Sequence, residues 1–411
     1  MKIGILTYHA VYNFGANLQA LSTYSYLKNA GYNPVIIDFF PEKLEETFDK
    51  HVPVVQANAH KSYLLQHFIL TKRCRNASDI AKEIIANNIE AIIIGSDAVV
   101  QHNPFLARIR INPSRKTILS LRIDPVCYET NYPNPFWGEF LEHLDNPIPV
   151  AMMSVSCQDT DYKLIIGGEK KGIGHNIEKL NFISVRDNRT QELFKHVSGG
   201  KCIPNVTPDP VFAFNDNILN LPDKNKILQK FKLPEKYFLL SFNSSRTVSK
   251  SWVVNFESIA NQSGYQCVAF TMPGGIKFDN SLQHKIDIPI DPLDWYCLIK
   301  YSSAYIGEKM HPVIVALHNS VPFFCFDHYG ILRFKLFQNQ RASKIYQILE
   351  KANLQDYRIS TIKKISYKAP TPEFVYEKIQ SIKKDDLAKF ADQMRNEYKI
   401  MMRNLMHELQ Y

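Results

Sequence analysis

The segment Ser302–Asp327 constrains the fold more than any other part of this chain. It reads as an apolar strand ending at Gly307, a polar turn, a short helix that begins at Pro312, and a second apolar strand over Val321–Phe326. A strand–helix–strand unit is the building block of a parallel sheet covered by helices. The polar turn therefore falls at the carboxyl end of a strand, where open α/β sheets hold their ligands.

This polar turn contains two candidate functional side chains, Lys309 and His311. Proline is favoured at the first position of a helix, so Pro312 makes His311 the expected N-cap. The free N–H groups and the dipole of the helix favour an anion here and disfavour imidazolium. His311 is therefore expected to be neutral near pH 7 and able to accept a proton. The alternative is a solvated Lys309 and a His311 that only caps the helix.

Composition indicates a globular protein. The 411 residues favour two domains, and 45% are hydrophobic while 22% are charged. The seven cysteines are odd in number and never spaced as C-x-x-C, which favours a reducing compartment and predicts neither a disulfide framework nor a zinc site. We expect no other metal and no cofactor. Met1–Tyr8 enters a strand without a signal-peptide pattern, and no apolar run approaches the roughly 18 residues of a membrane span. These features predict a cytoplasmic protein.

The chain is basic, with a formal net charge of +9 and a pI near 9.0. Such a charge permits nucleic acid, an anionic membrane face or acidic small molecules as partners. No nucleic-acid motif accompanies the basic residues, so nucleic acid is not expected. A solvated basic surface is the simplest interpretation, and peripheral contact with anionic lipid at the inner membrane face is the second.

Apolar strands that end in polar residues recur along the chain and predict an α/β fold with two facing Rossmann-like domains. The chain opens with a strand over Lys2–Tyr8, a helix over Asn17–Ala30 and a strand over Asn33–Phe39. The first loop has one glycine and not the three of a dinucleotide fingerprint. A later helix is expected over Leu332–Ala352. The predicted boundaries are 1–214 for an N-terminal α/β domain, 215–236 for a linker, 237–370 for a C-terminal α/β domain, and 371–411 for C-terminal helices that could cross back to the first domain.

Polar residues follow several predicted strands and would open toward the cleft between the domains. Besides Lys309 and His311, the candidate ligand-binding residues are Asn13, Gly15, Asn17, Gln19, Ser96, Asp97, Arg186, Asp209, Asn243, Ser244 and Lys344. Capping and turn chemistry is the alternative for Asn13, Asp97 and Asp209. For Arg186 the alternative is a structural ion pair with Asp187 or Asp209, and for Lys344 it is a solvated helix position.

The order of these motifs resembles the polysaccharide pyruvyl transferase family. The matching stretches are Tyr12-Asn13-Phe14-Gly15-Ala16-Asn17-Leu18-Gln19, Gly95-Ser96-Asp97, Ser184-Val185-Arg186-Asp187, Asp209-Pro210, Lys309-Met310-His311 and Ser343-Lys344-Ile345. Each is short, but their order and spacing span most of the chain.

The resemblance implies a GT-B-like fold, with the acceptor side in the first domain and the donor side in the second. It implies transfer of the pyruvyl group of phosphoenolpyruvate to two hydroxyls of one sugar in a capsular or exopolysaccharide precursor. A cyclic ketal forms and phosphate is released. By the same resemblance, Arg186 and Lys309 bind the donor and His311 carries protons. The acceptor could be a lipid-linked oligosaccharide.

Three positions depart from the family pattern. Lys309 stands where the family usually has Arg, Pro312 stands where it usually has Gly, and Ala98 replaces the Gln that usually follows Gly-Ser-Asp. Two alternatives therefore stay open. One is a sugar-nucleotide glycosyltransferase of the sialyltransferase type, whose His-Pro turn resembles His311-Pro312. The other is an inactive homologue that binds a sugar or an anion.

Overall fold

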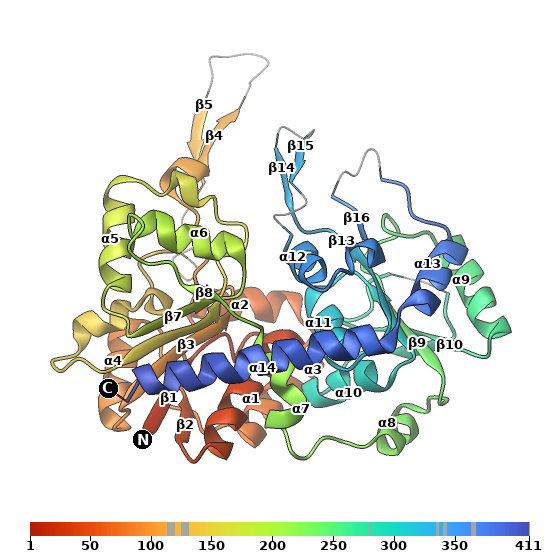
Figure 1. The fold of residues 1–411 in the computed structure, drawn as a ribbon, viewed down its shortest axis with the longest axis horizontal. Helices are drawn as coiled ribbons and strands as arrows, with labels where there is room; N and C mark the ends of the chain where they lie inside the picture. The colour runs from red at the N-terminus through yellow and green to blue at the C-terminus, as the bar shows by residue number, and fades with distance from the viewer. Residues whose placement is uncertain are drawn as a thin grey trace.

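The computed structural model describes residues 1–112, 120–124, 131–278, 281–333, 337–339, 343–362 and 367–410. Two parallel six-stranded sheets lie side by side, one in each half of the chain (Figure 1). The first sheet has the order β2 (Asn33–Ile36), β1 (Lys2–Leu6), β3 (Ala91–Asp97), β6 (Val150–Val155), β7 (Phe182–Val185), β8 (Asn205–Val206). The second has the order β11 (His284–Ile286), β10 (Gln266–Phe270), β9 (Tyr237–Ser241), β12 (Ala304–Gly307), β13 (Phe323–Asp327), β16 (Arg358–Ser360).

Helices cover both sheets, as expected for parallel strands that are buried on both faces. In the first half they are α1 (Phe14–Asn29), α2 (Glu42–His51), α3 (Val54–His67), α4 (Ala77–Ala86), α5 (Gly167–Ile177), α6 (Asn188–Val197) and α7 (Phe214–Asn217). In the second half they are α8 (Lys224–Phe231), α9 (Lys250–Gln262), α10 (Pro292–Tyr301), α11 (Met310–His318), α12 (Lys344–Lys351), α13 (Pro372–Ser381) and α14 (Lys384–Glu408). Among the described residues, no helix combines the length and the apolar character that a bilayer crossing requires.

Shorter elements complete the fold. The 3₁₀ turns are η1 (Phe105–Arg108), η2 (Pro135–Trp137), η3 (Glu139–His143), η4 (Tyr162–Leu164), η5 (Pro210–Ala213) and η7 (Gln355–Tyr357). Two antiparallel hairpins project from the body, β4 (Ile109–Asn112) with β5 (Ser120–Ile123), and β14 (Ile331–Arg333) with β15 (Phe337–Asn339) (Figure 1).

The strand order of each sheet reverses at one point, and these two points face each other. In the first sheet the reversal lies between β1 and β3, and in the second it lies between β9 and β12. Ligands of open α/β sheets bind in the crevice beyond the carboxyl ends of such strands. Gly15, which follows β1, is in contact with His311, which follows β12. The two crevices therefore form one site between the halves.

One continuous apolar core connects the two halves. It contains Ile5 and Phe14 from the first half, and Leu239 and Trp295 from the second. The rings of Phe14 and Trp295 are stacked with centroids 5.1 Å apart. The long helix α14 runs across both halves and packs against η5, α11, β6 and β7 (Figure 1). This shared packing fixes the two crevices relative to each other.

The helix predicted over Leu332–Ala352 is wrong in its first part. β14 and β15 pair there as an antiparallel hairpin, and α12 begins only at Lys344. The sequence from Leu332 alternates apolar and charged residues, a period of two that suits a strand. The start of α12 is set by Ser343, because its Oγ accepts the N–H of Tyr346 at 3.2 Å.

The helix after β12 begins earlier than its proline predicts. Lys309 is the N-cap of α11, and His311 lies inside the first turn, so the expected N-cap role of His311 is wrong. Proline is tolerated throughout the first turn because its missing N–H has no intrahelical acceptor there. Pro312 therefore does not mark the first helical position. Likewise Ser96 and Asp97 do not follow a strand, as predicted, but belong to β3 itself, because Asp97 still pairs with Val155 in the sheet.

Candidate active site

The imidazole of His311 lies directly against Gly15 at the start of α1. A Cβ atom on Gly15 would lie 2.0 Å from Cγ and 2.1 Å from Nδ1 of His311, so only glycine leaves room for the ring. Asn13 sets this end of α1, because its Oδ1 accepts the N–H of Gly15 at 3.0 Å. The first domain thus supplies the surface on which a histidine of the second domain rests.

The environment of His311 favours a neutral ring. The side chain is partly buried, and its enclosed Nε2 has no hydrogen-bond partner in the described part of the chain. Burial is the main cause that lowers the pKa of His311. The carboxylates of Asp209 and Asp97 raise this pKa, whereas the positive charges of Arg186 and Lys344 lower it further. A neutral imidazole with an unsatisfied nitrogen can accept a proton from a ligand.

Arg186 is held between two carboxylates. Its Nη1 is 2.8 Å from Oδ2 of Asp209, and its Nη2 is 3.4 Å from Oδ1 of Asp97. The side chains of Arg186 and Asp209 are only 8% and 1% exposed, and Gln19 also donates to Asp209. Burial raises the pKa of the Asp97 carboxyl, but the charges of Arg186, His311 and Lys344 and the N–H of Ala98 together outweigh burial, so the pKa lies below its usual value. The ion pair considered as the alternative for Arg186 is therefore present.

Two cavities meet at His311. One, of about 320 Å³, is lined by polar side chains of the first domain, including Asp97 and Gln101, and by Lys344 of the second. The other, of about 340 Å³, is lined by Asn243, Lys277 and Lys309 of the second domain. Five residues border both cavities, namely Asn13, Phe48, Met310, His311 and Tyr329. His311 thus separates a polar compartment from a cationic one.

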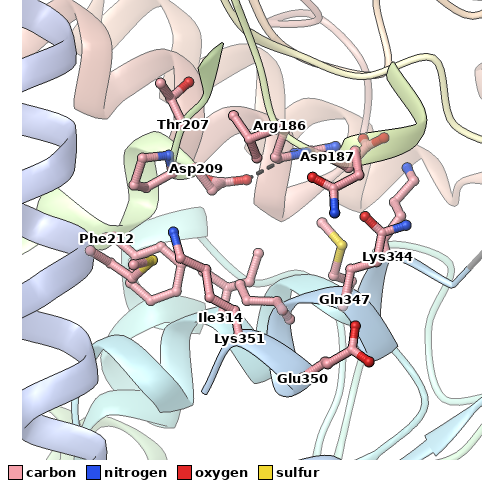
Figure 2. A pocket seen from close by; sticks show the side chains of 16 residues that line it. Arg186, Asp187, Thr207, Asp209, Phe212, Ile314, Lys344, Gln347, Glu350 and Lys351 are labelled. Atoms are coloured by element: carbon pink, nitrogen blue, oxygen red, sulfur yellow. Dashed lines mark hydrogen bonds and ion pairs between the residues drawn. The ribbon is translucent and has the colours of Figure 1, made fainter. Parts of the chain in front are cut away.

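A third cavity borders the Arg186–Asp209 ion pair, as Figure 2 shows. Its volume is about 260 Å³, and it lies between the start of α6 and helices α11, α12 and α14. Phe212 and Ile314 contribute apolar wall, and Lys344 lines both this cavity and the polar one beside His311. Burial lowers the pKa of Lys344, and the nearby Arg186 lowers it further.

The cationic cavity owes its charge to Lys309 and Lys277. The neighbouring carboxylate, Glu308, is buried and accepts hydrogen bonds from the backbone N–H of Asn243 at 3.3 Å and from its side-chain Nδ2 at 2.7 Å. No carboxylate of the described residues lies within ion-pair distance of either lysine. Burial lowers the pKa of Lys309, Glu308 raises it and Lys277 lowers it. An anionic ligand would relieve the repulsion between these two lysines.

Several predicted residues support the site without lining the three cavities. Asn17 and Ser96 are fully buried, and they donate to the carbonyl oxygens of His9 at 2.8 Å and Ser154 at 2.9 Å. Gln19 acts through Asp209. Ser244 lines none of these cavities, and its Oγ accepts the N–H of Arg246 at 3.1 Å.

Sequence reasoning missed several residues that the fold brings to the cavities, among them Lys277, Gln101, Gln158 and Tyr329. The sequence feature that could have indicated Lys277 is the turn Pro273-Gly274-Gly275. This turn follows β10 at the sheet edge where the other candidate residues of the second domain lie. The side chain of Lys277 lies over that turn, with Cε 3.1 Å from where a Cβ of Gly274 would be.

We expect Gly15→Ala to displace the His311 ring. The added methyl group overlaps the ring, and such overpacking costs about 1–3 kcal/mol of unfolding free energy. Urea denaturation of Gly15→Ala, His311→Ala and the double variant measures the coupling. Because the overlap vanishes with the ring, Gly15→Ala should cost nothing in the His311→Ala background. An equal cost in both backgrounds would contradict the contact.

The two facing switch points, with cavities between them, give this chain the two-domain Rossmann-like fold of the GT-B type. UGT89C1 of Arabidopsis thaliana is similar to it at 8% identity and a TM-score of 0.51, with 99% of each chain covered. A UGT transferase of Siraitia grosvenorii, solved with UDP, is similar at 9% identity and a TM-score of 0.50, with 100% of each chain covered. At these identities the likeness shows the fold alone. No curated protein matches the chain.

The sequence itself is more specific. The model of the polysaccharide pyruvyl transferase family matches residues 13–329, which include the Gly15 turn, Arg186 and the Lys309–His311 segment. The chain belongs to the polysaccharide pyruvyl transferase family, and the predicted family and fold are confirmed.

Proposed function

We propose that this protein transfers the pyruvyl group of phosphoenolpyruvate to two hydroxyls of one sugar, as a cyclic ketal, and releases phosphate. The observation that carries the proposal is His311, whose Nε2 has no partner among the described residues and which lies where a cationic and a polar cavity meet. Family membership supports the reaction class. Proton transfer between a trianionic donor and a sugar needs a proton-accepting side chain between the two cavities.

The donor suits the cationic cavity. Phosphoenolpyruvate is a compact anion with a phosphate and a carboxylate, which need cations and free N–H groups. Lys309 and Lys277 supply positive charge that no carboxylate of the described residues pairs, and the first turn of α11 supplies N–H groups beside them. Lys keeps the charge of the usual Arg but not its bidentate fork. Two lysines in one cavity compensate for that loss, and Arg186 and Lys344 add positive charge on the other side of His311.

The acceptor suits the polar cavity. Its amide side chains Asn13, Gln101 and Gln158 can hydrogen-bond to sugar hydroxyls, and Tyr8 and Phe48 offer apolar faces for a sugar ring. A sugar placed here has its hydroxyls on the opposite side of His311 from the donor. We propose a capsular or exopolysaccharide precursor as the acceptor, including one linked to a lipid.

The residues divide the proton transfers as follows. The methylene carbon of the donor gains a proton and becomes a methyl group, while its central carbon bonds to a sugar oxygen. His311, whose ring is neutral at pH 7, takes the proton of that hydroxyl and passes it to the methylene carbon, so the ring returns to its neutral form. The second hydroxyl closes the ketal at the same carbon as the bond to phosphate breaks, and its proton leaves with the phosphate. Lys309 and Lys277 stabilise the charge on the departing phosphate.

We expect calorimetric titration to show binding of phosphoenolpyruvate and none of UDP-sugars or CMP-sialic acid. Lys309→Ala and Lys277→Ala should each weaken this binding about tenfold or more, because each removes a charge-assisted contact. Lys285→Ala is the matched control, since Lys285 is exposed on β11 and lines none of the cavities. Binding of a sugar nucleotide instead would favour the glycosyltransferase alternative. Binding of phosphoenolpyruvate without turnover on any sugar would favour the inactive homologue.

A further inference from the structure

Tyr329 lies where the polar and the cationic cavity meet. It follows the carboxyl end of β13, and it is one of the five described residues that border both cavities. The other four are Asn13, Phe48, Met310 and His311. An amide, a phenyl ring and a thioether have no proton to exchange near neutral pH, so only His311 and Tyr329 can move protons at this junction.

The carboxylate of Asp327 fixes the backbone at Tyr329. Asp327 ends β13 and is fully buried, and its Oδ1 accepts the N–H of Tyr329 at 2.8 Å. Its Oδ2 accepts the hydroxyl of Ser343 and the Nε–H of Arg358, so two further segments hold the carboxylate in place. Tyr329 is therefore anchored to the end of the second sheet, which gives its side chain a fixed position at the two cavities.

The phenol of Tyr329 keeps its proton at neutral pH. Burial is the main cause that raises its pKa to about 12, and the negative charges of Asp327, Asp97 and Glu308 act in the same direction. No hydrogen bond joins its hydroxyl to another of the described residues. The phenol can therefore donate to an oxygen of a ligand and accept from a second one.

Every other ionisable side chain described in these two cavities borders only one of them. Tyr8, Asp97 and Lys344 border the polar cavity, and Tyr12, His51, Lys277 and Lys309 border the cationic one. A proton that passes from a sugar hydroxyl in the polar cavity to a phosphate oxygen in the cationic cavity needs a carrier that reaches both. Because His311 serves the first hydroxyl, Tyr329 is left for the second.

We propose that Tyr329 is a second catalytic residue, which carries the proton of the second sugar hydroxyl to the departing phosphate. This role rests on the proposed function. Addition of the first hydroxyl, with His311 as the base, gives an adduct whose central carbon still bears the phosphate. The oxygen of the second hydroxyl then bonds to that carbon, and the bond from the carbon to the phosphate oxygen breaks, leaving its electron pair on that oxygen. Tyr329 gives its phenolic proton to the phosphate oxygen and takes the proton of the hydroxyl, so the phenol is restored.

Tyr329→Phe tests the proposal, because it removes the hydroxyl and keeps the ring. With phosphoenolpyruvate and the methyl glycosides of galactose, glucose and mannose, the variant should release phosphate about 10²–10⁴-fold more slowly than the wild type, with donor binding unchanged. Phosphorus NMR of quenched reactions should show the phosphate-bearing adduct in Tyr329→Phe and none in His311→Ala. Tyr376→Phe is the matched control, because Tyr376 is a half-buried tyrosine of α13 that lines none of the three cavities. Matching thermal unfolding curves would show that the variants are folded.

The outcomes separate the role of Tyr329 from the proposed function. Phosphate release by Tyr329→Phe at nearly the wild-type rate would overturn the role of the tyrosine and leave the reaction standing. Slow release without accumulated adduct would place Tyr329 in the first addition and overturn its role in the departure of phosphate. Weaker donor binding at an unchanged kcat would also overturn that role, because the phenol would then only bind the donor. No phosphate release by the wild type with any of these sugars would overturn the proposed function itself, and the role of Tyr329 with it.

Discussion

We expect His311→Ala to lower turnover by about 10²–10⁴-fold, the usual contribution of a positioned general base. Donor binding should change little, because Lys309 and Lys277 remain in place. The fold should persist, because the ring lies at the cleft against Gly15 and accepts or donates no hydrogen bond through Nε2 among the described residues. Steady-state kinetics with a defined acceptor and a titration with phosphoenolpyruvate measure the two effects separately.

The pH profile gives a second test of the same residue. A base must be unprotonated, and burial lowers the pKa of His311 below its ordinary 6.5. Turnover should therefore be independent of pH just above 6.5 and should fall as the pH drops through the lowered pKa. His175→Ala is the matched control, because His175 is exposed on α5, and it should keep both the rate and the profile. Near-normal turnover in His311→Ala would rule out the catalytic assignment.

We expect Arg186→Ala to destabilise the protein by about 3–5 kcal/mol near pH 7, the cost of removing one partner from a buried ion pair. Asp209, at 1% exposure, and Asp97 would both lose their cation. In the wild type the lowered pKa of Asp97 contributes stability above its unfolded value of 3.8, and this is lost as the pH falls through the lowered pKa. The difference in unfolding free energy between the variant and the wild type should therefore become smaller at acidic pH. Urea denaturation at neutral and acidic pH measures it.

Arg186→Ala should also weaken binding of phosphoenolpyruvate, since it removes positive charge beside His311. The double variant Arg186→Ala, Asp209→Ala separates the two roles of the arginine. Removing both partners should recover part of the lost stability, because no buried carboxylate is left unpaired at position 209. Donor binding should stay weak if Arg186 contributes to the donor site. An unchanged donor dissociation constant in Arg186→Ala would show that the arginine only holds the loops together.

The sequence alone determined the class of fold because its signals are local. Runs of buried apolar residues that end in polar residues specify parallel strands, and caps such as Asp187 specify helix starts, whatever the rest of the chain does. The same locality made the family recognisable and pointed to Arg186, Lys309 and His311. It failed where two local signals compete, as at Pro312 and in the hairpin after Ile331, because a proline or an apolar run suits more than one element.

The tertiary structure decided what these residues can do. Arg186 is shared between Asp209 and Asp97 because the fold brings together segments that are distant in the chain. Lys277 lies beside Lys309 for the same reason. The contact of Gly15 with His311 requires both domains at once. Spacing in a sequence reports neighbours along one element, whereas pKa shifts, ion pairs and cavities arise from groups that only packing brings within a few ångströms. The sequence therefore pointed to Arg186, Lys309 and His311, and the packing assigned their partners and added Lys277.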